Sequence, residues 1–215
     1  MNRTSAHRVY IVEDDAVVRQ SLTAALRGQG YEVVGLGTAA EFFAQADLYE
    51  EGCVLVDLTL PGMSGPALQK RLCEVGSTLA VVVITTTGDV QAAVQAMELG
   101  AVTVLEKPFD PATLFPWVEK ALQRSRGYRA RRQAQLAVEA RLARLSEEER
   151  AVLELMVAGL PIKAISLRLR LSTRTVERRR KAILEKLQVR SLPELGVLLG
   201  RYWQMTGENG LGRTS

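Results

Sequence analysis

The chain has 215 residues, of which 47% are hydrophobic and 24% charged, the composition of an ordinary soluble globular protein. The longest apolar run, Leu79–Ile84, has six residues, whereas a membrane-spanning helix needs about 20. These values exclude a membrane protein, and the polar start of the chain contains no apolar signal region, so we expect a cytoplasmic protein.

The charges divide the chain into two halves. Residues 1–125 contain 15 acidic and 9 basic residues, a net charge of −6, whereas residues 126–215 contain 9 acidic and 19 basic residues, a net charge of +10. This division indicates two domains, and the second half suits a polyanion such as nucleic acid. The alternative is that the positive charge only keeps a helical domain soluble. We expect the cysteines, Cys53 and Cys73, to be small buried side chains rather than a disulfide or a zinc site.

The first half alternates short β-branched runs with helical patterns. The runs predict strands over residues 9–12, 31–36, 53–56, 79–84 and 102–105. Helical patterns cover residues 16–27, about 39–46, 64 to about 74, 90–99 and a stretch that begins near 111. Five apolar strands that alternate with helices predict an α/β doubly wound, five-stranded parallel sheet covered on both faces. Ligands of such sheets bind beyond the carboxyl ends of the strands.

From Ser146 onward the pattern is purely helical. Ser146 and Glu149 form a capping-box sequence that opens a helix to about residue 158. Further helices are predicted over residues 162–169, 172–187 and 191 to about 202. We therefore predict a first domain over 1–125, a linker over 126–143, a four-helix domain over 144–203 and a frayed tail over 204–215. Whether the linker is a continuous helix or a flexible joint stays open, because Gly127 lowers helix propensity without excluding a helix.

Acidic side chains gather where the predicted strands end. Glu13 and Asp14 follow the first strand and Asp57 follows the third, its neighbour in a doubly wound sheet. Clustered carboxylates repel one another, and Mg²⁺ suits such a cluster because it takes few protein oxygens and keeps its waters for a phosphate ligand. Thr85, after the fourth strand, and Lys107, after the fifth, should reach the same edge. Together these residues predict a clamp for a phosphoryl group on an aspartate.

Several motifs in this half carry a resemblance to a known family. They are Ile11-Val12-Glu13-Asp14-Asp15, the stretch from Val56 to Gly65, Ile84-Thr85, Gly88-Asp89-Val90 and Leu105-Glu106-Lys107-Pro108-Phe109. In their order and spacing they resemble the receiver domain of bacterial two-component response regulators, over residues 8–125. The resemblance implies that a sensor histidine kinase is the phosphoryl donor.

The resemblance also implies a role for each residue of the pocket. Asp57 would accept the phosphoryl group, while Mg²⁺, or Mn²⁺, would be held by Glu13, Asp14, Asp57 and the backbone carbonyl of Thr59. Thr85 would follow the phosphoryl oxygen, and Lys107 would pair with it. The bond between Lys107 and Pro108 would be cis. Asp15, one position later, is expected to be the N-cap of the first helix.

One position departs from the family's pattern. Receivers usually place Tyr or Phe three residues before the lysine, and that ring turns inward on activation. Here the position is Val104, which cannot make the same movement. This departure does not affect the phosphorylation chemistry. We expect the helix over 90–99 and its preceding loop, which starts at Thr86, to carry the conformational change of activation instead.

The helix predicted over 172–187 has two unlike faces. At 100° per residue, Val176, Ile183 and Leu187 form an apolar stripe, whereas Arg174, Arg178 and Lys181 lie on the opposite face. We expect Arg180, close to the stripe, to extend its charged end to solvent. A short helix, a tight turn and a longer helix with a basic outer face predict a helix-turn-helix. The alternative is a solvated basic face on a bundle helix.

The C-terminal domain resembles the LuxR-type four-helix DNA-binding domain over residues 144–203. The resemblance rests on Leu145-Ser146, Gly159-Leu160, Leu171-Ser172, Thr175-Val176, Glu185-Lys186-Leu187 and Val189-Arg190-Ser191, among other positions. It implies base contacts in the major groove by Glu177, Arg178 and Lys181. Phosphate contacts are implied for Lys163, Thr173, Arg174, Thr175 and Arg179. Ile162 and Ala164 stand where the family often has Asn and Glu, so this sequence departs from the family's pattern of polar contacts at these two positions.

A receiver followed by a LuxR-type domain is the order of the NarL/FixJ subfamily. This order predicts a phosphorylation-switched transcription regulator that binds promoter DNA and dimerises through about residues 89–122. One alternative is a Mg²⁺-dependent phosphohydrolase, but Thr59 stands where such enzymes need an acid, so we expect no enzyme and only slow loss of the protein's own phosphoryl group. A regulator that binds DNA independently of phosphorylation is the other alternative, because of Val104. His7 precedes the first strand and does not lie on a predicted helix of the kind that carries a phosphotransfer histidine, so we expect that the chain is not its own kinase.

Overall fold

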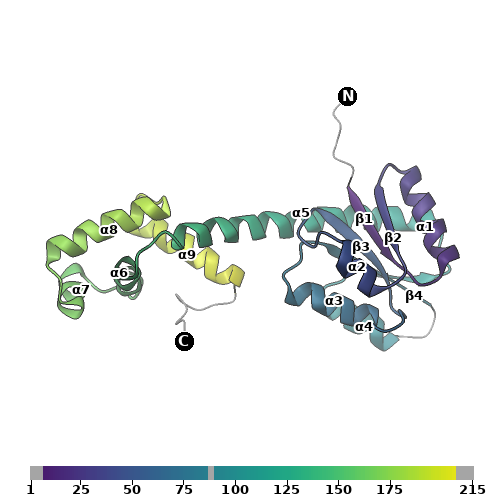
Figure 1. Cartoon of the computed structure of the whole chain (residues 1–215), viewed down its shortest axis with the longest axis horizontal. Coiled ribbons are helices and arrows are strands. Elements are labelled where there is room, and N and C mark those ends of the chain that lie inside the picture. Colours follow the sequence, from purple (N-terminus) through teal and green to yellow (C-terminus); the bar gives the residue numbers. More distant parts are fainter. Residues whose placement is uncertain (1–6, 87–89, 207–215) are drawn as a thin grey trace, which may run out of the picture. The chain divides into compact units, whose positions relative to one another are not determined.

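The computed structural model describes residues 7–86 and 90–206 of the chain (Figure 1). The chain divides into two compact units, Met1–Ala130 and Arg131–Ser215. Within the described ranges, no helix combines the length and the apolar character that crossing a membrane requires.

The first unit is built on a five-stranded parallel sheet in the order β2-β1-β3-β4-β5. Its strands are β1 (Arg8–Val12), β2 (Glu32–Leu36), β3 (Gly52–Asp57), β4 (Ala80–Thr86) and β5 (Thr103–Lys107). Its helices are α1 (Ala16–Gly28), α2 (Ala39–Gln45), α3 (Gly65–Glu74), α4 (Val90–Glu98) and the start of α5 (Pro111–Leu142). The predicted doubly wound α/β fold is confirmed.

Side chains that alternate along the strands form two cores, one on each face of the sheet. Ile11 and Leu55 pack with α1 and α5, whereas Tyr10 and Val56 pack with α2, α3 and α4. The two cores explain why the central strands are apolar throughout, since both of their faces are covered (Figure 1). Helices on both faces leave the carboxyl edge of the sheet as the place where polar side chains gather.

Some local predictions differ from the structure. Thr85 and Lys107 lie within the last two residues of β4 and β5 rather than after these strands. Cys53 is buried as predicted, but Cys73 is exposed, because it follows the buried Leu72 on α3 and a helix turns by about 100° between neighbours. The sequence left open whether the linker over 126–143 is a helix or a flexible joint; residues 126–142 belong to α5, a single helix that continues through Gly127.

The second unit contains the end of α5 and four further helices. They are α6 (Glu147–Val157), α7 (Ile162–Leu169), α8 (Thr173–Leu187) and α9 (Leu192–Thr206). The predicted capping box at Ser146 and Glu149 is present. α9 continues past the predicted end near residue 202 to Thr206, so residues 204–206 are helical rather than frayed, and the rest of the predicted tail lies outside the described residues.

Two helices of this unit end in the left-handed conformation without a glycine. Arg170 ends α7 with φ 52°, and Gln188 ends α8 with φ 57°. Both backbone N–H groups return to carbonyls in the last turn, which satisfies groups that a helix end leaves unpaired. The chain then turns sharply at Arg170, so that Ser172 can cap α8 through the Thr175 N–H at 3.1 Å.

Candidate functional site

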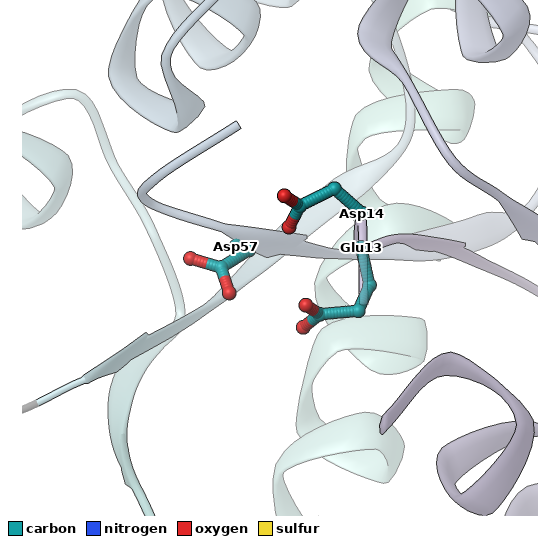
Figure 2. Close-up of side chains that lie close together, drawn as sticks. All are labelled: Glu13, Asp14 and Asp57. Atoms are coloured by element: carbon teal, nitrogen blue, oxygen red, sulfur yellow. The ribbon is translucent and has the colours of Figure 1, made fainter. Parts of the chain in front are cut away.

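Three carboxylates meet at the carboxyl edge of the sheet. Glu13 and Asp14 directly follow β1, and Asp57 is the last residue of β3, with Val12 paired beside Val56 in register. One carboxylate oxygen of each of the three acids lies within 4.8 Å of the others (Figure 2). Glu13 and Asp57 are 2% and 5% exposed, whereas Asp14 is exposed. The structure thus brings together the three acids that the sequence singled out.

Lys107 crosses to this cluster from the end of β5. Its Nζ donates to Asp57 Oδ2 at 2.5 Å and to Glu13 Oε2 at 2.6 Å. Burial raises the pKa of Glu13 by more than the hydrogen bond from Lys107 lowers it. Burial by itself lowers the pKa of Lys107, but its hydrogen bonds to Asp57 and Glu13 outweigh that effect and leave it raised. Lys107 is therefore held as a cation between two buried acids, and the peptide bond that follows it is cis, as expected.

The backbone around Asp57 is held closely. The Thr59 N–H donates to Asp57 Oδ1 at 2.8 Å, so both carboxylate oxygens of Asp57 have a partner. Gly65, the first residue of α3, lies so near that a Cβ there would approach the Asp57 carbonyl oxygen to 2.7 Å. A side chain at position 65 would push α3 away from the strand end. Sequence reasoning assigned Gly65 no role, although a glycine immediately before the first-turn Pro66 was a visible signal.

Arg19 is a second residue whose role was missed. From α1 its Nη1 donates to the carbonyl oxygens of Glu13 at 2.6 Å and Asp14 at 3.1 Å. The contact fixes the turn that carries both acids. Asp15 is the N-cap of α1, as predicted, because its Oδ1 accepts from the Val17 and Val18 N–H groups.

Thr85 lies at the same edge, but its hydroxyl points elsewhere. Thr85 Oγ1 donates to the Thr86 carbonyl oxygen at 3.0 Å, and its side chain is buried. Among the residues the structure describes, no hydrogen bond joins Thr85 to Asp57. The structure therefore places Thr85 near the pocket without bringing it into the charge cluster.

The donor set of the pocket fits a small divalent cation. The carboxylates of Glu13, Asp14 and Asp57 are hard oxygen donors from two adjacent strand ends, and only Asp14 is freely open to solvent. Mg²⁺ prefers such oxygens, takes few of them from the protein and retains water. Mn²⁺ accepts the same donors.

The second candidate surface is the outer face of α8. Val176, Ile183 and Leu187 are fully buried in the core of the second unit. The exposed predicted contact residues are Lys163, Thr173, Arg174, Glu177, Arg178 and Lys181, while Thr175 and Arg179 are half-buried. Arg180 is half-buried and lines a small cavity, in agreement with its predicted placement beside the apolar stripe.

Comparison with known proteins finds a matching protein family for each half of the chain. Residues 9–119 match the family model of the response regulator receiver domain, and residues 143–199 match that of the luxR family of bacterial regulatory proteins. The chain belongs to the response regulators. This response regulator is 42% identical over 187 residues to the transcriptional regulatory protein FixJ of Azorhizobium caulinodans, which covers 87% of this chain and 89% of that protein. It is 36% identical to the tetrathionate response regulatory protein TtrR of Salmonella typhimurium, over 87% of this chain and 89% of that protein.

Solved structures of full-length regulators agree with this membership. The response regulator StyR aligns with a TM-score of 0.73 at 35% identity, over 92% of this chain and all of that chain. Full-length FixJ from B. japonicum aligns with a TM-score of 0.56 at 35% identity, over 94% of this chain and 99% of that chain. The prediction of a two-component transcription regulator with a receiver and a LuxR-type DNA-binding domain is confirmed.

Proposed function

We propose that Asp57 accepts a phosphoryl group from the phosphohistidine of a sensor histidine kinase and that this reaction controls DNA binding by α8. The observation that carries the proposal is the position of Lys107 Nζ, within 2.6 Å of both Asp57 and Glu13 at the edge where three acids meet. A lysine held between two buried carboxylates is a cation ready to pair with added phosphoryl charge.

The chemistry is a transfer from nitrogen to oxygen. A carboxylate oxygen of Asp57 attacks phosphorus, the P–O bond forms as the P–N bond of the donor breaks, and the released imidazole takes a proton from water. The Thr59 N–H orients one Asp57 oxygen, and Lys107 neutralises charge on the other side. Mg²⁺ or Mn²⁺, held by Glu13, Asp14, Asp57 and the Thr59 carbonyl, would offset the charge of the phosphoryl oxygens.

Thr85 then provides the first step of the response. Its hydroxyl is committed to the Thr86 carbonyl oxygen, and pairing with a phosphoryl oxygen requires that this bond be given up. The change moves the end of β4, which leads into α4. Val104 is half-buried and packs in the core shared with α4, and with no ring there, the end of β4 and α4 carry the signal. Residues 87–89 of the connecting loop lie outside the described residues.

The proposed reaction stops at the protein's own phosphoryl group. An aspartate-based phosphohydrolase needs an acid that protonates the leaving group. Thr59, two residues after Asp57, is exposed and supplies its backbone N–H, not an acid, to the pocket. We therefore expect slow self-dephosphorylation and no turnover of external phosphomonoesters.

Dimerisation is proposed to follow phosphorylation, through the predicted surface over about residues 89–122, of which residue 89 lies outside the described residues. Val90, Val94 and Met97 are exposed on α4 and recur at four- and three-residue spacing, so they form one apolar stripe. An exposed stripe of this kind marks an interaction surface. Two paired chains would present two α8 helices to DNA.

DNA recognition is proposed to divide between two sets of side chains. Glu177, Arg178 and Lys181 project from the exposed face of α8 and suit base edges in the major groove. The remaining predicted residues suit backbone phosphates; they are Lys163, Thr173, Arg174, Thr175 and Arg179.

The test measures binding to promoter-length DNA at fixed salt, with and without a phosphoryl donor and Mg²⁺, for wild type and Asp57→Asn. Mass is read in the same samples. We expect phosphorylation to tighten binding and double the mass in the wild type only. Equal binding by both proteins in every condition would support a regulator that acts independently of phosphorylation.

A further inference from the structure

The turn that joins β1 to α1 carries two of the three acids of the pocket. β1 ends at Val12 and α1 begins at Ala16, so the carbonyl groups of Glu13 and Asp14 lie outside both the strand ladder and the helix (Figure 2). The Glu13 N–H donates to the Leu36 carbonyl oxygen at 3.1 Å, which fixes the strand side of the turn. The position of the two carboxylates then depends on what holds the carbonyl side.

Arg19, in the first turn of α1, holds that side. Its Nη1 donates to the carbonyl oxygens of Glu13 at 2.6 Å and Asp14 at 3.1 Å. Its backbone N–H donates to the Asp15 carbonyl oxygen at 2.9 Å. One residue therefore bonds three successive carbonyl groups of the turn. Because these bonds end on backbone oxygens, they leave the carboxylate oxygens of the two acids to an ion.

Two glycines give the Arg19 side chain its route from α1 to the turn. A Cβ at Gly35 would lie 3.3 Å from Arg19 Cγ and 3.5 Å from its Cδ, and a Cβ at Gly37 would lie 3.7 Å from Nη1. Gly35 is an exposed residue of β2, at a position where a strand would favour a β-branched side chain. The glycine at this position therefore serves the passage of the arginine, not the stability of the strand.

We propose that Arg19 is a positioning residue for the divalent cation of the pocket, an inference that rests on the metal site of the proposed function. By holding three successive carbonyl groups, Arg19 sets the Glu13 and Asp14 carboxylates in the arrangement that the ion requires. Mg²⁺ demands near-ideal octahedral geometry, so a small displacement of its ligands weakens binding. Groups that orient metal ligands contribute about tenfold or more to metal affinity.

Charge alone predicts the opposite effect. Arg19 is a cation beside the pocket, and its removal would relieve repulsion and strengthen the binding of another cation. A role confined to the stability of the fold predicts no change in metal affinity. The direction in which metal affinity changes therefore separates positioning from both charge and stability.

The test titrates Mn²⁺ into the full, unphosphorylated chain and measures the free ion by its electron paramagnetic resonance signal. Arg19→Ala should bind Mn²⁺ about tenfold more weakly than wild type. Arg27→Ala is the matched control and should retain wild-type affinity. Arg27 lies about two turns further along α1, has the same charge and also donates to a backbone carbonyl oxygen, that of Val33 at 2.9 Å. Asp14→Asn, which should bind far more weakly, locates the bound ion in the pocket.

Gly35→Val keeps the arginine but blocks its route, and valine suits an exposed strand position. This variant should also weaken Mn²⁺ binding. In the Arg19→Ala background it should cause no further loss, because both substitutions act through the same contact. Thermal unfolding in a chelating buffer checks that each variant is folded.

The outcomes separate this inference from the metal site on which it rests. If wild type binds Mn²⁺ no better than Asp14→Asn, the proposed metal site is wrong and the inference falls with it. If wild type binds through the pocket and Arg19→Ala binds equally well or more tightly, the metal site stands and the positioning role is overturned. Additive losses from Arg19→Ala and Gly35→Val would overturn the route across Gly35.

Discussion

The acidic pocket and the outer face of α8 use charge in opposite ways. In the pocket, charged groups from three strand ends converge, two of the acids are buried, and Lys107 bonds to both. On the outer face of α8, charged side chains diverge into solvent from one helix; an ion pair there, Lys181 to Glu185 at 3.9 Å, is itself exposed. Convergent charges in a buried site act as a unit, whereas exposed charges act one at a time. Substitutions should therefore be all-or-none in the pocket and graded on α8.

The largest expected effect is the loss of phosphorylation in Asp57→Asn, because the amide removes the attacking oxygen charge and one acid of the cluster. Phosphate incorporation from a phosphoryl donor, measured by mass spectrometry, should be absent. Asp15→Asn is the matched control: it lies beside the pocket, and asparagine is an equally good N-cap for α1. Incorporation equal to wild type in Asp57→Asn would show that another residue is the acceptor.

The second effect tests whether the pocket charges act as a unit. Lys107→Met leaves Glu13 and Asp57 without their cation, and we expect the free energy of unfolding to fall by about 3 kcal/mol in a chelating buffer. Mg²⁺ should then stabilise Lys107→Met more than wild type, because the ion replaces the missing positive charge. Thermal unfolding measures both values.

Lys70→Gln, at an exposed position of α3, provides the control for this prediction and should resemble wild type with and without Mg²⁺. An equal response to Mg²⁺ in wild type and Lys107→Met would mean that the lysine and the ion do not share the same carboxylates.

The sequence predicted the site residues whose positions follow from the periodicity of the strands. It missed those whose contacts depend on how a long side chain extends. Glu13, Asp14 and Asp57 could be found because strand ends in a parallel sheet share an edge. Arg19 could not, because its contact with two carbonyl oxygens depends on how a long side chain folds back from α1.

The conformation of helix ends and the solvent exposure of single residues could likewise not be predicted from the sequence pattern. Arg170 and Gln188 adopt the left-handed conformation that sequence rules reserve for Gly or Asn, because the chain on both sides fixes the turn. Cys73 lies in an apolar stretch, yet one step of helical rotation turns it from the core to solvent. Composition predicts that a segment packs, and the exact rotation of the helix decides which residue is covered.

On α8 the expected effects are smaller and separable. Arg178→Ala should weaken binding to the preferred DNA sequence by about 1–3 kcal/mol and relax selectivity at one base pair. Arg174→Ala should weaken binding to all sequences alike. It should also reduce the number of counterions released on binding, which the salt dependence measures, by about one.

Competition binding over a series of salt concentrations measures both effects. Arg201→Ala, exposed on α9, is the control and should retain wild-type selectivity. Identical losses in Arg174→Ala and Arg178→Ala would contradict a division between base and phosphate contacts.

The smallest effect concerns Glu149, the one buried acid among those residues of the second unit that the structure describes. It accepts from the Ser146 N–H at 2.8 Å and from Lys186 Nζ at 2.6 Å, and the bond to Lys186, followed by that to Ser146, lowers its pKa. A lowered folded-state pKa means that the stabilisation is present above the ordinary value of 4.5 and is lost as the pH falls through the lower folded value.

Glu149→Gln retains the capping-box acceptor but loses the charge, so it should cost about 1 kcal/mol at neutral pH. The difference from wild type should shrink as the pH drops below about 4.5. Hydrogen exchange at α6 amides measures this difference, with Glu147→Gln, exposed in the same first turn, as control. A difference that is constant with pH would show that Glu149 acts through its shape and hydrogen bonds alone. Glu149 would then differ from the buried acids of the pocket, Glu13 and Asp57, whose role depends on their charge.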